Sequence, residues 1–340
     1  MAKKILIVGP AWVGDMVMAQ SLFITLKQNA PDCQIDVLAP AWSFGLLARM
    51  PQVNKAIAMP LTHGQFGLGE RLTLGKQLRA AQYSHAIVLP NSWKSALIPF
   101  FADIKQRTGY IGECRWGLLN DARKLDKQQL TMTVQRFVAL GLDASATQAP
   151  TCPTPRLAIS PQQKQTVRDK FAINTTTKVL ALCPGAEYGE AKRWPVAHFA
   201  ATALAKLEQG WQIWLFGSEK DQDAAAHINQ QTQGRCVDFT GRTTLAEAVD
   251  LLSLADAVVS NDSGLMHVAA ALDKPLIALY GSSDPGFTPP LNDDAQIISL
   301  NLPCSPCFKR VCHLYPPGHE KHTACLQGIQ PEQVLKLLPP

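Results

Sequence analysis

Short apolar segments alternate with longer amphipathic segments along the whole chain, a pattern typical of parallel α/β domains. The apolar segments of the first half predict strands near Lys3–Val8, Gln34–Ala39, Lys55–Met59 and Ala86–Leu89. Those of the second half predict strands near Val179–Gly185, Gln212–Phe216, Cys236–Phe239, Ala257–Ser260 and Pro275–Gly281. The segments between them predict helices near Met16–Asn29, Ser43–Met50, Glu70–Ala80, Thr131–Leu140, Pro161–Phe171, Leu245–Leu254, Leu265–Leu272 and Pro331–Leu338. The expected fold class is therefore α/β with parallel sheets.

A proline-rich segment interrupts this alternation near the middle of the chain. Residues Ala144–Gln163 contain four prolines and little that could form a core, so we expect them to link two domains. At 340 residues the chain is long for one domain and comfortable for two. We expect one α/β domain over residues 1–150 and a second one over 151–340, whose last helix can pack on either domain, including back on the N-terminal one.

Composition places the chain among globular proteins without a membrane span. Hydrophobic residues make up 46% of the chain, but no apolar run reaches the ~18 residues of a spanning helix, and Asp15 interrupts the apolar N-terminal segment. The nine cysteines, an odd number, fit reduced thiols better than a disulfide framework, which predicts a cytoplasmic protein. A net charge of +5 is too modest to suggest a nucleic-acid binder.

The loop after the first predicted strand carries one acidic residue into the start of a helix. Gly9 and Gly14 match neither the dinucleotide-binding pattern G-x-G-x-x-G nor a P-loop, which disfavours a dehydrogenase. Asp15 would lie at the carboxyl end of the sheet, where parallel sheets bind ligands. Two roles are open for this carboxylate, a general base facing a cleft or only an acid that stabilises the first helical turn.

The segment 258–281 has the pattern of a phosphate-binding β-α-β unit. Its first strand ends at three residues that cap helices well, Asn261, Asp262 and Ser263, and an apolar helix follows. Gly264 has no side chain to keep an anion away from the unpaired N–H groups of the first turn. The same pattern also fits an ordinary, well-capped α/β connection.

Two further loops of the second half carry charged residues suited to a nucleotide. Lys192 and Arg193 precede the helix that Trp194-Pro195 opens, where they either bind a diphosphate or are ordinary surface cations. Asp221 follows a predicted strand at a place where an acid can bind ribose hydroxyls, although acids in a first helical turn are common. The second half therefore fits the binding of an activated nucleotide.

A stretch of mixed basic and aromatic residues follows the fourth predicted strand. From residue 92 to residue 124 six basic residues face three acidic ones, and Trp93, Tyr110 and Trp116 are interleaved. Such a stretch could bind an anionic, sugar-like acceptor, with aromatic rings on the sugar and arginine on phosphate, or it could be a solvated surface. The candidate acceptor contacts are Asn91, Lys94, Arg107 and Arg115.

Several motifs together resemble those of one enzyme family. They are GPAWVGDMVMAQSL (residues 9–22), LPNSWKSALIPFF (89–101), RTGYIGE (107–113), LLND (118–121), CPGAEYGEAKRWP (183–195) and NDSGLMHVAAAL (261–272). In this order they resemble the ADP-heptose:lipopolysaccharide heptosyltransferases over nearly the whole chain. The resemblance implies a GT-B fold, in which two Rossmann-like domains face a central cleft, with the acceptor on the N-terminal domain and the ADP-sugar on the C-terminal one.

The resemblance also implies a reaction and the residues that perform it. An inverting transfer would move L-glycero-D-manno-heptose from ADP-heptose to the first heptose of the lipopolysaccharide inner core, on heptosyl-Kdo2-lipid A, and release ADP. Asp15 matches the family's catalytic base, Lys192 its diphosphate lysine and Asp221 its ribose-binding acid. The positions matched around the diphosphate and heptose are Asp262, Ser263, Gly264 and His267. His267 has the alternative of a buried helix histidine bonded to backbone.

Two positions depart from the family pattern, and a cysteine cluster lies outside it. Glu187 and Tyr188 stand where a related heptosyltransferase has two threonines, so this chain lacks the threonine hydroxyls there. A structural zinc ion could bind at the cluster, or its thiols could be free; the cluster comprises Cys304, Cys307, Cys312 and Cys325. The implied chemistry requires no cofactor. The implied location is the cytoplasmic face of the inner membrane, with peripheral contact through the basic face of the N-terminal domain.

Two other functions stay open from the residues alone. A nucleotide-sugar epimerase or hydrolase of the same fold would need no lipid-linked acceptor, and the basic and aromatic stretch argues mildly against it. A non-catalytic binding module would leave Asp15 dispensable while needing the cysteine cluster.

Overall fold

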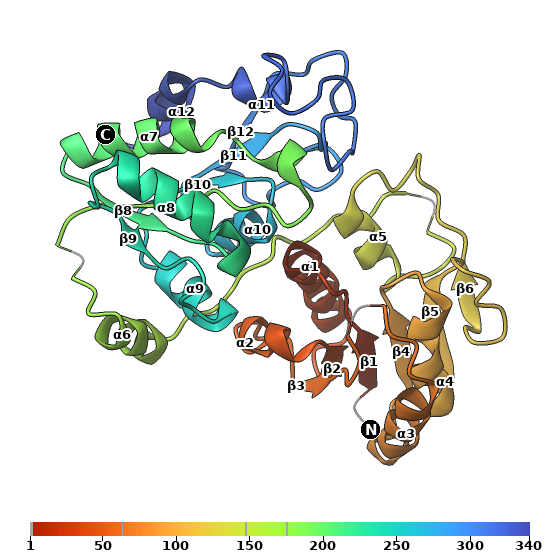
Figure 1. Ribbon diagram of the computed structural model, residues 1–340. Helices are drawn as coiled ribbons and strands as arrows, with labels where there is room; N and C mark the ends of the chain where they lie inside the picture. The colour runs from red at the N-terminus through yellow and green to blue at the C-terminus, as the bar shows by residue number, and fades with distance from the viewer. Residues whose placement is uncertain (1–2, 63, 147, 175) are drawn as a thin grey trace. The chain divides into compact units, whose positions relative to one another are not determined.

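The computed structural model describes residues 3–62, 64–146, 148–174 and 176–340, and its ribbon is drawn in Figure 1. The chain forms two compact units, the N-terminal unit Met1–Leu157 and the C-terminal unit Ala158–Pro340. The change of unit falls inside the proline-rich segment, where prolines lack the N–H group that a sheet or helix would use. Each unit contains a parallel sheet of its own.

The sheet of the N-terminal unit has six parallel strands in the order β3-β2-β1-β4-β5-β6. They are β1 (Lys4–Val8), β2 (Gln34–Ala39), β3 (Lys55–Ala58), β4 (His85–Val88), β5 (Gln106–Tyr110) and β6 (Asp121–Arg123). β1 lies in the middle, with Leu6 opposite Asp36 on one side and Ala86 on the other. A central strand of a parallel sheet is covered on both faces, and residues 5–8 of β1 are accordingly buried.

Four helices of the N-terminal unit pack in pairs. The helices of this unit are α1 (Val13–Asn29), α2 (Phe44–Leu47), α3 (Leu68–Leu78), α4 (Leu97–Phe101) and α5 (Thr133–Ala139). α1 packs against α5, and α3 packs against α4 (Figure 1). Gly75 permits the second contact, because a Cβ added there would lie only 2.4 Å from the Cβ of Phe101.

The C-terminal unit repeats the same sheet arrangement. Its strands are β7 (Val179–Cys183), β8 (Gln212–Leu215), β9 (Val237–Asp238), β10 (Ala257–Asn261), β11 (Leu276–Tyr280) and β12 (Gln296–Ser299). All pairings are parallel, and the order β9-β8-β7-β10-β11-β12 is that of the first sheet. Both units therefore have the strand order of a Rossmann-like fold.

The helices of the C-terminal unit bury a core rich in aromatic residues. They are α6 (Pro161–Lys170), α7 (Val196–Glu208), α8 (Gln222–Gln231), α9 (Leu245–Leu252), α10 (Gly264–Ala271), α11 (Ala324–Gln327) and α12 (Pro331–Leu337). α7 packs against α8, and α6 packs against α9. The rings of Trp194 and Phe199 meet edge to face with 4.8 Å between centroids, and both side chains are buried.

The structure resolves one alternative and changes several boundaries. α12 packs on α7 within the C-terminal unit, with Val334 and Leu338 in the core of that unit. α1 begins at Val13, three residues before the predicted start, so that Asp15 lies inside its first turn. The basic and aromatic stretch, for which no helix or strand was predicted, contributes α4, β5 and β6. Among the described residues, no helix is long and apolar enough to cross a membrane.

The strand order changes direction once in each sheet, between β1 and β4 and between β7 and β10. Loops that leave two such neighbouring strands run to opposite faces of the sheet, and ligands bind beyond the carboxyl ends of the strands at that point. A site is therefore expected in the loops after β1 and β4 in one unit, and after β7 and β10 in the other.

Candidate active site

A lysine and an aspartate meet beyond the carboxyl ends of β7 and β10. Lys192 ends a short 3-10 helix, η4 (Glu190–Lys192), in the loop after β7, and Asp262 directly follows β10. The Lys192 Nζ lies 2.5 Å from Asp262 Oδ2, with side-chain exposures of 17% and 5%. Seventy positions separate the two residues, and they meet because β7 and β10 are neighbours in the sheet. The result is a largely buried ion pair where a ligand is expected.

Asn261 holds both ends of the loop that carries Lys192. Its side chain is fully buried, Nδ2 donates to the Pro184 carbonyl at 2.7 Å, and Oδ1 accepts from the Trp194 N–H at 3.0 Å. The sequence predicted a helix-capping role instead, and the structure corrects it, because Asn261 is the last residue of β10. Only one feature of the sequence pointed to this positioning role of Asn261, namely that it is a polar residue at the end of an apolar strand.

The start of α10 lacks a side-chain cap. Ser263 is the N-cap residue, and within the described chain it makes no capping hydrogen bond to the helix. Its Oγ instead lies 3.3 Å from Ser260 Oγ. Gly264 is the first helical residue, so the partial positive charge of the first turn lies next to Asp262 and leaves N–H groups for a bound anion.

His267 lies in α10 beside the ion pair. Burial lowers the pKa of its imidazole to about 4, while Asp262 raises this pKa and Lys192 lowers it further. The ring is therefore neutral at neutral pH. Within the described residues it makes no hydrogen bond to backbone, unlike the alternative considered from the sequence.

Asp221 joins the loops after β7 and β8. Its Oδ2 accepts hydrogen bonds from the N–H and the hydroxyl of Ser218, at 2.9 and 2.8 Å. Its Oδ1 lies 3.5 Å from the Arg193 guanidinium. A Cβ added at Gly185 would lie 2.5 Å from the same carboxylate, so the glycine permits this approach. Asp221 thus supports the loop geometry, and its contact with ribose stays a prediction.

The two positions that depart from the family pattern are both engaged. The Glu187 carboxylate lies 2.5 Å from the Lys220 Nζ, and both side chains are at least half exposed. The Tyr188 hydroxyl donates to the Phe308 carbonyl at 2.7 Å. Neither group replaces a threonine hydroxyl as a donor to phosphate in this arrangement.

Asp15 lies at the corresponding edge of the N-terminal sheet. It is half-buried in the first turn of α1, just past the carboxyl end of β1. This position suits a base facing a ligand, and it also lets the carboxylate stabilise the helix through its dipole. Geometry within the unit agrees with both roles.

The loop after β4 brings polar and aromatic residues to the same edge. β1 and β4 are neighbours, and the Leu89 N–H donates to the Val8 carbonyl at 3.1 Å as the two strands end. Asn91 and Trp93 are exposed in the loop that follows. The Lys94 Nζ reaches the carbonyl of Gln65 at 3.4 Å. These residues and Asp15 follow adjacent strands, as an acceptor site requires.

Both predicted acceptor arginines have structural contacts instead. Arg115 is 1% exposed, and its guanidinium donates to the carbonyls of Pro90 and Tyr110. Arg107 donates to the carbonyls of Leu118 and Ile104 at 2.7 and 2.6 Å. Burial lowers the pKa of Arg115, as expected for a guanidinium surrounded by backbone. The prediction that Arg115 contacts the acceptor is therefore wrong, because a buried guanidinium cannot reach an acceptor.

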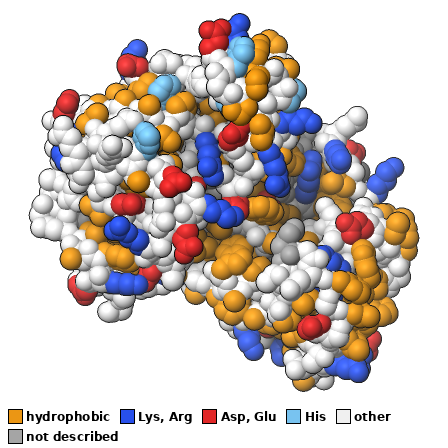
Figure 2. All heavy atoms as spheres, in the orientation of Figure 1, with side chains coloured by type: hydrophobic (Ala, Val, Ile, Leu, Met, Phe, Trp, Pro, Cys, Tyr) orange, Lys and Arg blue, Asp and Glu red, His pale blue; other side chains and the backbone are white. Residues whose placement is uncertain are grey.

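Large hydrophobic side chains are exposed on the N-terminal unit. They include Trp12 at 47%, Trp93 at 40% and Trp116 at 64% exposure, and Trp93 contacts Phe66 with 5.1 Å between ring centroids. Hydrophobic side chains cover much of the visible face of this unit in Figure 2. Exposed hydrophobic side chains that gather on one surface are typical of a site that binds another molecule.

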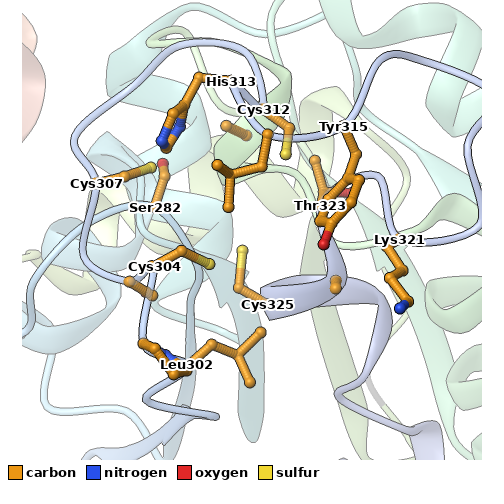
Figure 3. A pocket seen from close by; sticks show the side chains of 15 residues that line it. Ser282, Leu302, Cys304, Cys307, Cys312, His313, Tyr315, Lys321, Thr323 and Cys325 are labelled. Atoms are coloured by element: carbon orange, nitrogen blue, oxygen red, sulfur yellow. The ribbon is translucent and has the colours of Figure 1, made fainter.

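The four C-terminal cysteines line one pocket of the C-terminal unit. The cavity measures about 330 Å³, and Figure 3 shows the thiols of Cys304, Cys307, Cys312 and Cys325 around it. Burial, together with the other three thiols, raises the pKa of Cys325 to about 11. In the described part of the chain, no group of three or more His, Cys, Asp or Glu residues is arranged to hold a metal ion.

Comparisons with known proteins agree with this arrangement. A sequence profile described as Glycosyltransferase family 9 (heptosyltransferase) matches residues 71–316. Lipopolysaccharide heptosyltransferase 2 of Salmonella typhimurium is 51% identical over 306 residues, which cover 87% of this chain and 88% of that protein. Lipooligosaccharide heptosyltransferase 2 of Haemophilus influenzae is 51% identical over 308 residues, with the same two coverages. The solved structure of ADP-heptose lps heptosyltransferase II from E. coli is 44% identical, with a TM-score of 0.86, and the match covers 98% of this chain and 97% of that one.

These similarities extend over most of the chain and concern transferases. They give no support to an epimerase or a hydrolase. They also agree with the observed pair of Rossmann-like units, which is the architecture of the GT-B class. The chain is therefore a glycosyltransferase that belongs to glycosyltransferase family 9, the heptosyltransferases.

Proposed function

We propose that this heptosyltransferase moves L-glycero-D-manno-heptose from ADP-heptose to the first heptose of the lipopolysaccharide inner core and releases ADP. The proposal rests on the similarity to heptosyltransferase 2 proteins over 87% of the chain. The observation that carries it is the pair of Lys192 and Asp262 at the uncapped start of α10. Such a place suits the diphosphate of a nucleotide-sugar.

The C-terminal unit would bind the donor. The ADP leaving group gains negative charge as the sugar departs, and Lys192 and the first turn of α10 would stabilise that charge. Asp262 holds the lysine ammonium in place, and Asn261 holds both ends of its loop. We place Ser263, Gly264 and His267 around the diphosphate and heptose, and Asp221 near the ribose.

The N-terminal unit would bind the acceptor. Asp15 would take the proton of the acceptor hydroxyl as this oxygen attacks the anomeric carbon from the face opposite ADP. An ordinary carboxylate is adequate for this step, since the hydroxyl becomes acidic as the new bond forms. One displacement inverts the anomeric configuration. No step of this reaction requires a metal ion or another cofactor.

The acceptor is lipid-linked, and we place the enzyme at the cytoplasmic face of the inner membrane. Asn91 and Lys94 would contact the acceptor sugar and its anionic groups. The exposed rings of Trp12, Trp93 and Trp116 support peripheral contact, because indole rings suit the boundary between lipid and water.

We further propose that the cysteine pocket binds a structural zinc ion. Four thiols around one cavity are a suitable donor set, although they would have to move together to reach the ~2.3 Å of a Zn–S bond. One zinc per purified chain, lost in Cys307→Ser with Cys33→Ser as the control, is the expected result. A metal-free wild-type chain with full activity would contradict it.

The proposed reaction is tested by ADP release from ADP-heptose with and without heptosyl-Kdo2-lipid A. We expect release only when both substrates are present, and a gain of one heptose in the mass of the acceptor. Equal release without the acceptor would identify a hydrolase and contradict the proposal.

A further inference from the structure

The loop between β7 and α7, residues 184–195, is called the donor loop below. The cations around it are almost all neutralised by carboxylates. Lys192 pairs with Asp262, Arg193 lies 3.5 Å from Asp221, and Lys220 pairs with Glu187. These three pairs contribute no net charge. The diphosphate of a nucleotide-sugar carries two negative charges and gains a third when the bond to the sugar breaks, so an unpaired cation near Lys192 would help to stabilise it.

Arg310 and Lys192 both lie over the ring of Tyr188, and in the described part of the chain Arg310 has no carboxylate partner. Its guanidinium carbon is 5.3 Å from the centroid of the Tyr188 ring, and the Lys192 Nζ is 5.0 Å from the same centroid. The two charges are therefore at most about 10 Å apart. Arg310 is exposed, and among the residues that the structure describes no carboxylate lies within ion-pair distance of it.

The backbone around Arg310 is held against the loop that carries Lys192. The Arg310 carbonyl accepts from the Ala191 N–H at 3.0 Å. A Cβ added at Gly189 would lie 2.4 Å from this carbonyl oxygen, so only glycine permits the approach.

Phe308 strengthens this attachment from both of its backbone groups. Its carbonyl accepts from the Tyr188 hydroxyl at 2.7 Å, and its N–H donates to the Ser282 carbonyl at 2.7 Å. Phe308 adopts a left-handed conformation with φ of 53°, which is costly for a bulky residue and must be maintained by such contacts. The segment 308–310 is thus attached to the donor loop on one side and to the end of β11 on the other.

We infer that Arg310 is a donor-binding residue, whose guanidinium binds the diphosphate of the nucleotide-sugar together with Lys192, while the Tyr188 ring holds both cations. This inference rests on the proposed function of the C-terminal unit. A guanidinium forms paired, charge-assisted hydrogen bonds with phosphate oxygens, and stacking on an aromatic ring orients it for them. Tyr188 thereby acts through its ring, since its hydroxyl is bound to Phe308.

Calorimetric titration with ADP and with adenosine tests this assignment. We expect Arg310→Ala to weaken ADP binding about ten-fold, the effect of one charge-assisted hydrogen-bonding group at an exposed site, and to leave adenosine binding unchanged. Arg310→Lys should recover part of the loss. Lys309→Ala is the matched control, because it removes the neighbouring exposed cation, and it should bind ADP like the wild type.

A second pair of variants tests the role of the ring. Tyr188→Leu should weaken ADP binding in the wild type and have a smaller effect in Arg310→Ala, because the ring acts through the arginine. Thermal unfolding of each variant checks that the unit is folded.

Two outcomes would overturn the inference, and they are distinguishable. If Lys192→Ala weakens ADP binding and Arg310→Ala does not, Arg310 is not a donor-binding residue, while the proposed function stands. If the wild type itself does not bind ADP, the proposed function and the inference both fail.

Discussion

At the scale of single residues, the ion pair of Lys192 and Asp262 is the most informative feature of the site. Asp262 is 5% exposed, and burying a carboxylate with its partner costs about as much desolvation energy as their attraction returns. Such a pair is therefore poor evidence for stability alone. Its position at the start of α10 is better explained by the charge that a departing diphosphate brings.

Two substitutions separate the stabilising and catalytic parts of this pair. Lys192→Met should lower the free energy of unfolding by about 3 kcal/mol, because it leaves a buried carboxylate uncompensated. It should also lower the rate of ADP release about 10²- to 10³-fold. Adding Asp262→Asn should restore the stability but not the rate, as measured by urea unfolding and by steady-state assay.

An exposed ion pair of the same unit provides the control. Lys170 lies 2.5 Å from Glu247 with half of its side chain exposed, so Lys170→Met should change the free energy of unfolding by less than about 1 kcal/mol. Recovery of ADP release in the double variant Lys192→Met/Asp262→Asn would mean that Lys192 only neutralises Asp262.

At the scale of elements, the apolar pattern predicted the strands of both sheets except β5, β6 and β12. β1, β7, β10 and β11 consist mostly of buried apolar residues, because both faces of these central strands are covered, and such runs predict strands directly. β6 and β12 lie at the ends of their sheets and carry polar residues such as Asp121 and Gln296, which read as loop. β5 is not an edge strand, but it begins with Gln106, Arg107 and Thr108 and was missed for the same reason. The edge strands β3 and β9 lie in apolar segments and were predicted.

The arginines of the N-terminal unit show a second limit of the sequence. Composition cannot distinguish a solvated arginine from one whose guanidinium binds backbone carbonyls, as that of Arg115 does. Folding brings Pro90 and Tyr110 to Arg115 from two different strand ends. The residues of the C-terminal site were easier to identify, since Lys192 and Asp262 both lie in loops that follow predicted apolar strands.

The segment before α11 contacts the donor loop through a pH-sensitive ion pair. His322 Nε2 lies 3.1 Å from Glu190, the first residue of η4. The hydrogen bond to the Tyr315 carbonyl, and next the charge of Glu190, raise the pKa of His322 above its ordinary 6.5. The folded chain thus holds this proton more tightly than the unfolded chain does.

This shift predicts the direction of a pH effect on stability. The stabilisation is complete below pH 6.5 and is lost as the pH rises through the raised pKa of His322. We therefore expect the thermal midpoint of the wild type to exceed that of His322→Gln at about pH 6 and to approach it at about pH 9. His227→Gln, on the exposed face of α8, is the control. A constant difference across this range would rule out His322 as the cause.

At the scale of the whole molecule, two Rossmann-like units of the same strand order carry different chemical groups. The C-terminal unit has the lysine, the uncapped helix start and the further arginine, which all suit a diphosphate. The N-terminal unit has a carboxylate at the equivalent edge and exposed aromatic rings. The motif resemblance predicted the family correctly, because six motifs in a fixed order are far more specific than any one of them.

The division of labour between the units is the central claim, and one comparison tests it most directly. ADP affinity and acceptor-dependent ADP release are measured for the wild type, Asp15→Asn and Lys192→Met. We predict that Asp15→Asn binds ADP like the wild type while its rate falls about 10²- to 10⁴-fold, the loss expected without a general base. Lys192→Met should lose both binding and rate. Unchanged turnover in Asp15→Asn would contradict the account and leave Asp15 as an acid that only stabilises the first turn of α1.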